Sequence, residues 1–265
     1  MKIGETYKQM FGMNTGITKL PFITAIYQTL AGKLHPKSIK VGKYDLLLDN
    51  GDSTRLSQWD VPFPEEQEYY ARTLKKGMII VDVGASLGFF TLLFAEKAEQ
   101  VLSFEPLPET YELLKQTVNM NKLRNVLPIN LALADFNGKT TLNLAQGNVG
   151  GGSVAHDLNK GKTIEVDVVK LDDIYLDRID LIKIDVEGAE LMVLKGAEGR
   201  LRRDKPTIVF EFNPAFMKDY GIGLLNYLEG IGYSIRTLDG KEIHKHKLIA
   251  DLAEKGTFTN LEAKQ

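Results

Sequence analysis

The stretch VDVGASLGFF, residues 81–90, decides the fold of this chain. An apolar run, MIIVDV (78–83), reads as a buried strand. It breaks at a turn built on Gly84 and Gly88 and resumes as FFTLLFA (89–95), which reads as a helix. A strand that passes through a glycine turn into a helix is the opening of a βαβ unit.

The alternation continues on the C-terminal side of this unit. Further strands are expected at 101–105, 125–133, 180–186, 206–212 and 233–239, and helices at 108–121, from Ala189 and near Leu224. This spacing indicates a parallel sheet with helices on its faces. An antiparallel pair, 139–145 with 162–169, interrupts the series, and the glycine-rich segment 146–161 joins its two strands.

The N-terminal 60 residues read as a cap made of a helix and a hairpin, before a core over 61–250 and a weakly patterned tail over 251–265. The cap helix falls on ITKLPFITAIYQTLAGKL (17–34), which Lys19 and Pro21 interrupt, so it is too broken to span a bilayer. The hairpin is expected over 38–58, centred on Asn50-Gly51. A helix from Pro64 to Gly77 leads into the core.

The composition is that of a globular protein, with 265 residues, 43% apolar residues and a net charge of −2. A nucleic-acid binder normally shows a strong positive excess, so no nucleic-acid partner is expected. The absence of cysteine excludes disulfides, thiolate zinc sites and cysteine nucleophiles. It fits a reducing compartment, and we expect a cytoplasmic protein. The sequence does not determine the oligomeric state, and a homo-oligomer is compatible with it.

The strand ends indicate the ligand, because open parallel sheets bind at the carboxyl ends of their strands. The turn lacks the third glycine of a dinucleotide fingerprint and the lysine of a phosphate loop, and Asp82 would repel phosphate. Glu105 ends the second strand, where a carboxylate can accept hydrogen bonds from both ribose hydroxyls. Ribose without pyrophosphate points to S-adenosylmethionine. The alternatives are tight packing for the two glycines and a solvated strand end for Glu105.

Four segments, VDVGASLGFFTLLFA, SFEPLPETYELLKQTVNMN, IEVDVVKLDDI and IDLIKIDVEGAELMVLKGA, resemble the successive signature blocks of FkbM-type methyltransferases. The resemblance implies a Rossmann-like class I methyltransferase core with a mostly parallel seven-stranded sheet, and methyl transfer from S-adenosylmethionine. The chain departs from the family at Ser86-Leu87, where Asn-Ile is frequent. With the strand-end positions beside the turn, the expected cofactor site comprises Asp82, Gly84, Ala85, Ser86, Gly88, Glu105, Pro106, Leu133 and Asp185.

Methyl transfer to a hydroxyl calls for a group that accepts the proton. The candidates are Asp185 and Glu187 in KIDVEGAE, Glu211 in VFEFNPAF, and His156 in the glycine-rich segment. Asp185 and Glu187 are alternatively ligands of Mg²⁺, although no metal site is assigned. Glu187 can instead cap the following helix, and His156 can simply be solvated.

Lys183, Trp59 and the pair Tyr69-Tyr70 each have a structural interpretation as well as a functional one. Lys183 is expected to pair with a carboxylate. Trp59 and the pair Tyr69-Tyr70 either close over the cofactor or pack the cap.

The acceptor is expected to be a hydroxyl of a sugar, glycan or secondary metabolite, as the resemblance implies. Two other functions stay open at this point. One is methylation of nucleic acid or protein, and the other is a non-catalytic module that binds S-adenosylmethionine.

Overall fold

The computed structural model describes residues 36–50, 52–144, 152–153, 163–217 and 221–265. The expected cap helix at 17–34, Gly51 and His156 lie outside the described residues.

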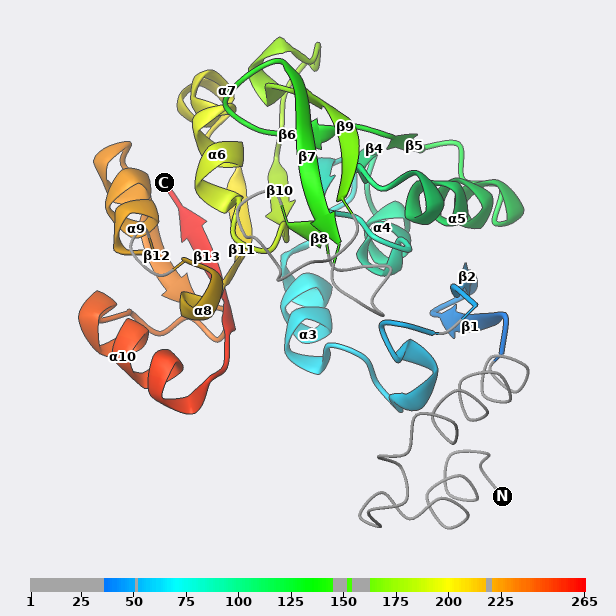
Figure 1. Ribbon diagram of the computed structural model, residues 1–265, viewed down its shortest axis with the longest axis horizontal. Coiled ribbons are helices and arrows are strands. Elements are labelled where there is room, and N and C mark those ends of the chain that lie inside the picture. Colours follow the sequence, from blue (N-terminus) through cyan, green and yellow to red (C-terminus); the bar gives the residue numbers. More distant parts are fainter. Residues whose placement is uncertain (1–35, 51, 145–151, 154–162, 218–220) are drawn as a thin grey trace.

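A seven-stranded sheet forms the centre of the molecule, as the sequence predicts (Figure 1). Its order is β12-β13-β11-β10-β3-β4-β5, and β13 alone runs antiparallel to its two neighbours. Chain order reverses between β3 and β10, which places the crevice of a doubly wound sheet beside the glycine turn. The strands are β3 (Ile79–Val83), β4 (Gln100–Phe104), β5 (Val126–Ile129), β10 (Leu181–Ile184), β11 (Thr207–Phe212), β12 (Ser234–Thr237) and β13 (Thr259–Lys264).

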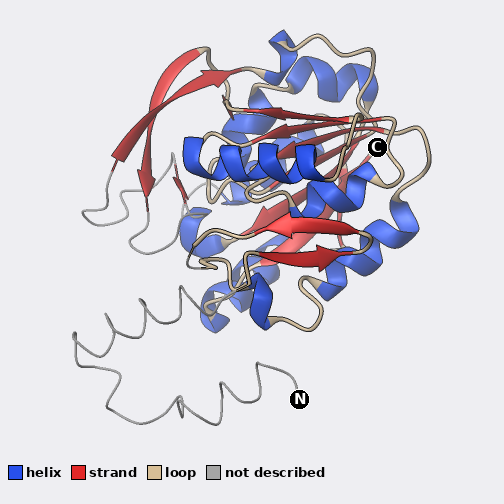
Figure 2. Cartoon of the chain, turned by 90° about the vertical axis from the view of Figure 1, so that its right-hand side faces the viewer, coloured by secondary structure: helices blue, strands red, loops and turns tan. Residues whose placement is uncertain are grey.

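Helices cover both faces of this sheet (Figure 2). They are α3 (Pro64–Thr73), α4 (Phe89–Ala95), α5 (Pro108–Met120), α6 (Glu190–Lys195), α7 (Glu198–Asp204), α8 (Pro214–Met217), α9 (Gly221–Gly230) and α10 (Lys245–Lys255), with 3-10 turns η2 (Leu56–Gln58) and η3 (Leu171–Asp173).

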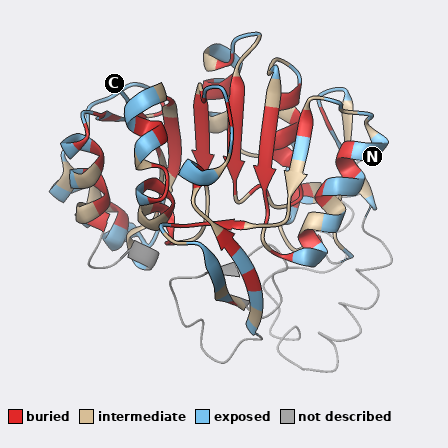
Figure 3. Ribbon diagram, turned by 90° about the horizontal axis from the view of Figure 1, so that it is seen from above, coloured by how far each residue is buried: buried red, intermediate tan, exposed pale blue. Residues whose placement is uncertain are grey.

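Successive strand residues point to opposite faces and feed two separate cores. Ile79, Val81 and Val83 pack with residues of α6, α7, α9 and α10, whereas Ile80 packs with α3, α4 and α5. Both faces are therefore buried, and the central strands are buried along their length (Figure 3).

The expected antiparallel pair is confirmed and belongs to a second, four-stranded sheet of order β6-β9-β7-β8. It contains β6 (Ala132–Leu133), β7 (Gly138–Leu144), β8 (Gly152–Ser153) and β9 (Thr163–Val169). The strand expected over 125–133 is split between the two sheets, because β5 pairs with β4 while β6 pairs with β9.

The N-terminal hairpin turns at a different place from the one predicted. Strands β1 (Ser38–Val41) and β2 (Tyr44–Leu47) turn at Gly42-Lys43, so the prediction that the hairpin is centred on Asn50-Gly51 is wrong. A turn does close across that point, where Asp52 N donates to the Asp49 carbonyl at 3.0 Å. Gly42 supplies the positive φ of 57° that the hairpin turn requires. Helix α5 then fixes the hairpin, because Thr117 Oγ1 accepts from Leu47 N at 3.1 Å and Asn121 Oδ1 from Asp45 N at 2.9 Å.

The C-terminal residues form part of the core and not a tail. Strand β13 inserts between β11 and β12, and Leu261 and Ala263 are fully buried. The segment 251–265, expected as a weakly patterned C-terminal tail, thus ends in a strand of the central sheet. Its pattern is weak because a six-residue strand next to a short helix offers little periodicity to read.

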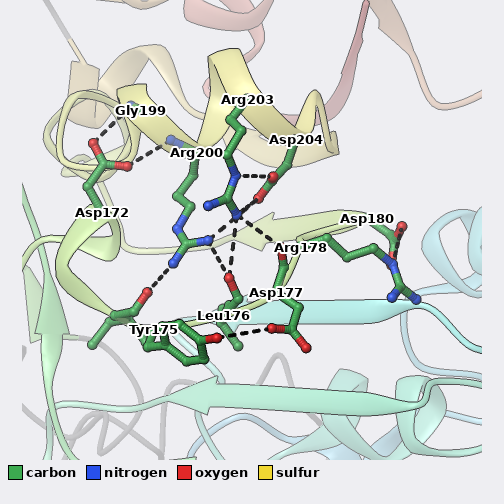
Figure 4. A network of polar contacts seen from close by, with 11 residues as sticks. Asp172, Tyr175, Leu176, Asp177, Arg178, Asp180, Gly199, Arg200, Arg203 and Asp204 are labelled. Carbon is green, nitrogen blue, oxygen red and sulfur yellow. Dashed lines mark hydrogen bonds and ion pairs between the residues drawn. The ribbon is translucent and has the colours of Figure 1, made fainter.

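A polar network closes the connection between η3 and β10 (Figure 4). The guanidinium of Arg200, itself buried, donates to the carbonyl of Leu176 at 2.6 Å and to that of Ile174. Asp172 accepts from the backbone N–H groups of Gly199 and Arg200, each at 2.8 Å. These bonds hold residues 174–176 against α7 and so position the start of β10.

We predict that Arg200→Ala lowers the free energy of unfolding by about 2–4 kcal/mol, because it leaves the Ile174 carbonyl without its charged donor and the Leu176 carbonyl with only the longer bond from Arg203 at 3.4 Å. The matched control is Arg202→Ala on the same helix, where an exposed ion pair with Glu198 at 2.8 Å is removed. That change should cost about 0.5 kcal/mol or less. Urea denaturation measures both, and equal losses would contradict the role given to Arg200.

Candidate active site

A cavity of about 250 Å³ lies at the carboxyl ends of β3, β4, β10 and β11. The sequence predicts ligand binding at this edge. Predicted site residues that line it are Gly84, Ala85, Ser86, Glu105, Pro106, Leu133, Asp185, Glu187 and Glu211. Asp82 and Gly88 are not among the lining residues.

The two glycines of the turn are required by packing. A Cβ on Gly84 would lie 1.9 Å from the carbonyl oxygen of Asp185, and one on Gly88 would lie 2.6 Å from Leu114 Cδ1. Both residues also have positive φ, 76° and 98°. Gly84 thus allows β3 and β10 to approach each other, and Gly88 allows α4 to begin against α5. The packing alternative holds for both, and Gly84 lines the cavity as well.

Glu105 is buried at the end of β4, with 5% of its surface exposed. Its Oε2 accepts from Ser86 N at 2.9 Å and its Oε1 from Leu107 N at 3.0 Å. Burial raises its pKa to about 7, and the two backbone N–H groups oppose the shift. Each carboxylate oxygen keeps a second lone pair for a ligand hydroxyl. The alternative of a solvated strand end is therefore wrong.

Asp82 lies beneath the cavity in a buried polar row. Its Oδ2 accepts from Thr91 Oγ1 at 2.7 Å, and its Oδ1 lies 3.7 Å from Lys183 Nζ. Lys183 Nζ also lies 3.3 Å from Asp185 Oδ2. Lys183 is thus paired with carboxylates as expected, and it also lines the cavity. Burial raises the pKa of Asp82, against the lowering effect of Lys183 and Thr91.

Asp185, Glu187 and Glu211 meet at one end of the cavity. Burial and the charge of Asp185 raise the pKa of Glu187 to about 7. Burial raises the pKa of Glu211 to about 8, and Asp185, Glu190 and Glu187 add to the shift. Carboxyl groups with a pKa near neutrality are suited to exchange protons with a substrate.

Glu190 holds the turn that precedes the next helix. Glu190 Oε1 accepts from Gly188 N at 3.1 Å and from Val186 N at 3.4 Å. The N-cap of α6, Ala189, makes no side-chain cap hydrogen bond, and Glu187 lines the cavity.

The sequence did not predict that residues just before α3 form one wall of the cavity. Thr54, Leu56 and Phe63 line it, although no motif marks them. The only signal was their position just before an aromatic-rich helix. Tyr69 and Tyr70 are buried in the core beneath, with Tyr69 donating to Glu262, so these two tyrosines pack and do not line the cavity.

Within the part of the chain that the structure describes, no three His, Asp or Glu side chains are grouped closely enough to hold a metal ion. In the same residues, no helix has both the length and the apolar character needed to cross a membrane.

Comparison with known proteins gives one family. The FkbM methyltransferase domain matches residues 82–235, more than half of the chain. A methyltransferase of Sordaria araneosa, sdnD, is 32% identical over 167 residues, which cover 49% of this chain and 64% of that protein.

Two further relatives carry the name of what they act on. The hexuronic acid methyltransferase AglP of Haloferax volcanii is 26% identical over 129 residues, covering 47% of this chain and 52% of that protein. A tRNA(Phe) aminocarboxypropyltransferase of Methanocaldococcus jannaschii is 33% identical over 73 residues, covering 27% of this chain and 29% of that protein. Each of these three matches spans less than two thirds of the relative's own length.

The raised pKa values at the cavity predict how stability depends on pH. An unfolded Glu211 releases its proton near its ordinary pKa of 4.5, but the folded protein holds it until about pH 8. The folded state therefore binds more protons between these values, and stability falls as the pH rises through them. Glu211→Gln should raise the free energy of unfolding at pH 8 by about 1 kcal/mol or more and change it little at pH 5.

Urea denaturation at the two pH values measures this difference. Glu254→Gln, at an exposed position of α10, is the control and should have no effect at either pH. An effect of Glu211→Gln that is equal at both pH values would contradict the raised pKa.

Proposed function

The chain belongs to the FkbM methyltransferase family, and we propose that it transfers a methyl group from S-adenosylmethionine to a hydroxyl of a sugar, glycan or secondary metabolite. This proposal rests on one observation: a ribose-binding candidate and a set of proton-accepting candidates line the same cavity. Glu105, buried beside the glycine turn, is suited to a ribose, and a cluster of carboxylates with raised pKa values lies at the other end.

The lining of the cavity fits the parts of S-adenosylmethionine. Pro106, Leu107 and Leu133 offer an apolar surface for the adenine next to Glu105. Glu105 would hold the ribose hydroxyls through the lone pairs that Ser86 N and Leu107 N leave open. The small residues of the turn, from Gly84 to Ser86, leave room for the methionine part.

When bound, S-adenosylmethionine supplies a methyl group attached to a sulfonium, which is a good leaving group. The protein has to align the acceptor hydroxyl, exclude water and accept a proton. Alignment alone can lower the barrier by about 7 kcal/mol or more in favourable cases. The buried faces of Phe89, Phe90 and Phe63 line the cavity and exclude water from it.

We assign the role of proton acceptor to Glu211. Its pKa of about 8 lies nearer to a working pH than that of an ordinary carboxyl, and it lines the cavity together with Asp185 and Glu187. Asp185 is held by Lys183, so it is suited to orient the hydroxyl. His156 stays a candidate from the sequence that lies outside the described residues.

The charges at the cavity also affect which class of acceptor can bind. Once Glu187 and Glu211 have released their protons, the carboxylates at the cavity and the net charge of −2 would repel a polyanion, which favours a small molecule or glycan over nucleic acid.

We predict that Glu105→Ala weakens the binding of S-adenosylhomocysteine at least about tenfold, since two charge-assisted hydrogen bonds to ribose are lost. Calorimetric titration measures the affinity, and circular dichroism checks the fold. Glu109→Ala, at an exposed position in the first turn of α5, is the control and should bind normally. Unchanged affinity in folded Glu105→Ala would refute the ribose assignment, and no binding by the unaltered protein would refute the proposed cofactor.

We predict that Glu211→Gln lowers kcat by about 10²-fold or more, because the group that accepts the proton is removed. The unaltered protein should show a rate that rises with pH up to an apparent pKa of about 8. The variant should lose that rise while binding S-adenosylhomocysteine normally. EDTA should leave the rate unchanged, because this role needs no metal. A variant that keeps the rate and its pH profile would assign the proton transfer to another group.

A further inference from the structure

An aromatic wall borders the cavity just before α3. Phe63 lines the cavity, and the centroid of its ring lies 5.2 Å from those of both Phe89 and Phe90. Trp59, which the sequence offered as a residue that closes over the cofactor, is stacked on Phe63 with centroids 6.1 Å apart and planes inclined by 24°, and it is not among the lining residues. Trp59 is 53% exposed, whereas a tryptophan of this size is usually well buried.

The wall adjoins the carboxylate end of the cavity. Phe90 carries Lys183 Nζ over its ring, 5.0 Å from the centroid, and the same Nζ lies 3.3 Å from Asp185 Oδ2. A molecule lying on Phe63 would therefore have Asp185, Glu187 and Glu211 within the same cavity.

The backbone holds Phe63 in an unfavourable conformation. Its φ of 50° lies in the left-handed region, which costs a residue other than glycine about 1–3 kcal/mol. Phe63 precedes α3 without any side-chain cap, so a small polar residue would serve the helix better. Such strain persists where the surroundings enforce it and is concentrated at ligand sites.

We propose that Phe63, with Trp59 stacked on it at the rim, forms the acceptor subsite, where the aromatic surface packs against the apolar face of an uncharged or cationic carbohydrate ring. This inference rests on the proposed function and names its substrate class. A sugar ring has a face of C–H groups, which suits an aromatic surface, and a rim of hydroxyls, which suits Asp185, Glu187 and Glu211 as acceptors.

The charges decide against an acidic sugar. Three carboxylates line the acceptor end, and Lys183 is the cation among the described lining residues. Lys183 is already within 3.7 Å of Asp82 and 3.3 Å of Asp185, so it has little attraction left for an anionic ligand. Above about pH 8, where Glu187 and Glu211 have released their protons, a uronate would add like charge at short range in a site of low dielectric. The chain should therefore differ in acceptor from its relative that acts on hexuronic acid.

Trp59 is the only tryptophan in the sequence, so its fluorescence reports directly on this wall. The experiment is run at about pH 9, above the pKa values of Glu187 and Glu211. It titrates the protein, saturated with S-adenosylhomocysteine, with methyl glycosides of glucose, galactose, mannose, rhamnose and glucosamine, and with methyl glucuronide and galacturonide. We expect a saturable change in emission with at least one neutral or amino sugar, and binding at least about tenfold weaker for the uronates.

Phe63→Leu keeps apolar volume but removes the ring, and it should weaken sugar binding at least about fivefold while the affinity for S-adenosylhomocysteine stays the same. Tyr175→Ala removes an aromatic residue that is 89% exposed and outside the cavity lining, and it should change nothing. If Phe63→Leu unfolds, the exposed Trp59→Leu replaces it, with sugar binding followed by saturation-transfer NMR.

Three results would overturn the inference: no saturable change with any of the sugars, tighter binding of a uronate, or equal sugar binding by the folded variant. In each case S-adenosylhomocysteine still binds and the proposed function stands. Failure of S-adenosylhomocysteine to bind the unaltered protein is a separate result that refutes the proposed function itself.

Discussion

A buried polar row across three strands underlies the whole site. Lys183 on β10, Asp82 on β3 and Ser103 on β4 are direct register partners, so their side chains stand in line across the sheet. Thr91 of α4 joins the row by bonding Asp82 at 2.7 Å and Ser103 at 2.9 Å. Buried charges are costly unless they are paired, and removal of either partner leaves the other uncompensated. The row therefore fixes the relative positions of the strands whose ends form the cavity.

The row adjoins the carboxylates of the cavity above it. Lys183 Nζ lies 3.7 Å from Asp82 Oδ1 and 3.3 Å from Asp185 Oδ2, so it is already paired. Glu187 and Glu211 are half-buried beside the charge of Asp185, which raises their pKa values to about 7 and about 8. Burial and like charge thus produce the groups that can accept a proton near neutral pH, and the cost appears as lower stability in that range.

Helices and strands that show a local pattern of apolar residues could be predicted from the sequence. Features that depend on contacts between residues far apart in the chain could not. The runs around residues 81–90, 101–105 and 181–184 specify strands whose ends carry Gly84, Glu105 and Asp185, so the edge of the sheet and the polar part of the cavity lining could be predicted. The burial of Asp82 could not, because it depends on Lys183, 101 positions away and its partner only once the sheet forms. Strand β13 and the wall at Phe63 were missed for the same reason, since both owe their places to tertiary pairing and packing.

Three residues with a strained backbone line the cavity. Phe63, Ser86 and Glu187 all have positive φ, between 48° and 50°, and all three line the cavity from different parts of the chain. Each lies where the chain passes between an element and a turn, and none is a glycine that would adopt this conformation freely. Asp52, Arg55, Lys122 and Lys205 also have positive φ and lie outside the cavity lining, so it is the position of these three residues, and not strain alone, that connects them to the site. The strained backbone places the turn at Ser86, the carboxylate of Glu187 and the ring of Phe63 around one cavity. The aromatic wall, the cofactor-binding groups and the proton-transfer groups therefore form a single site.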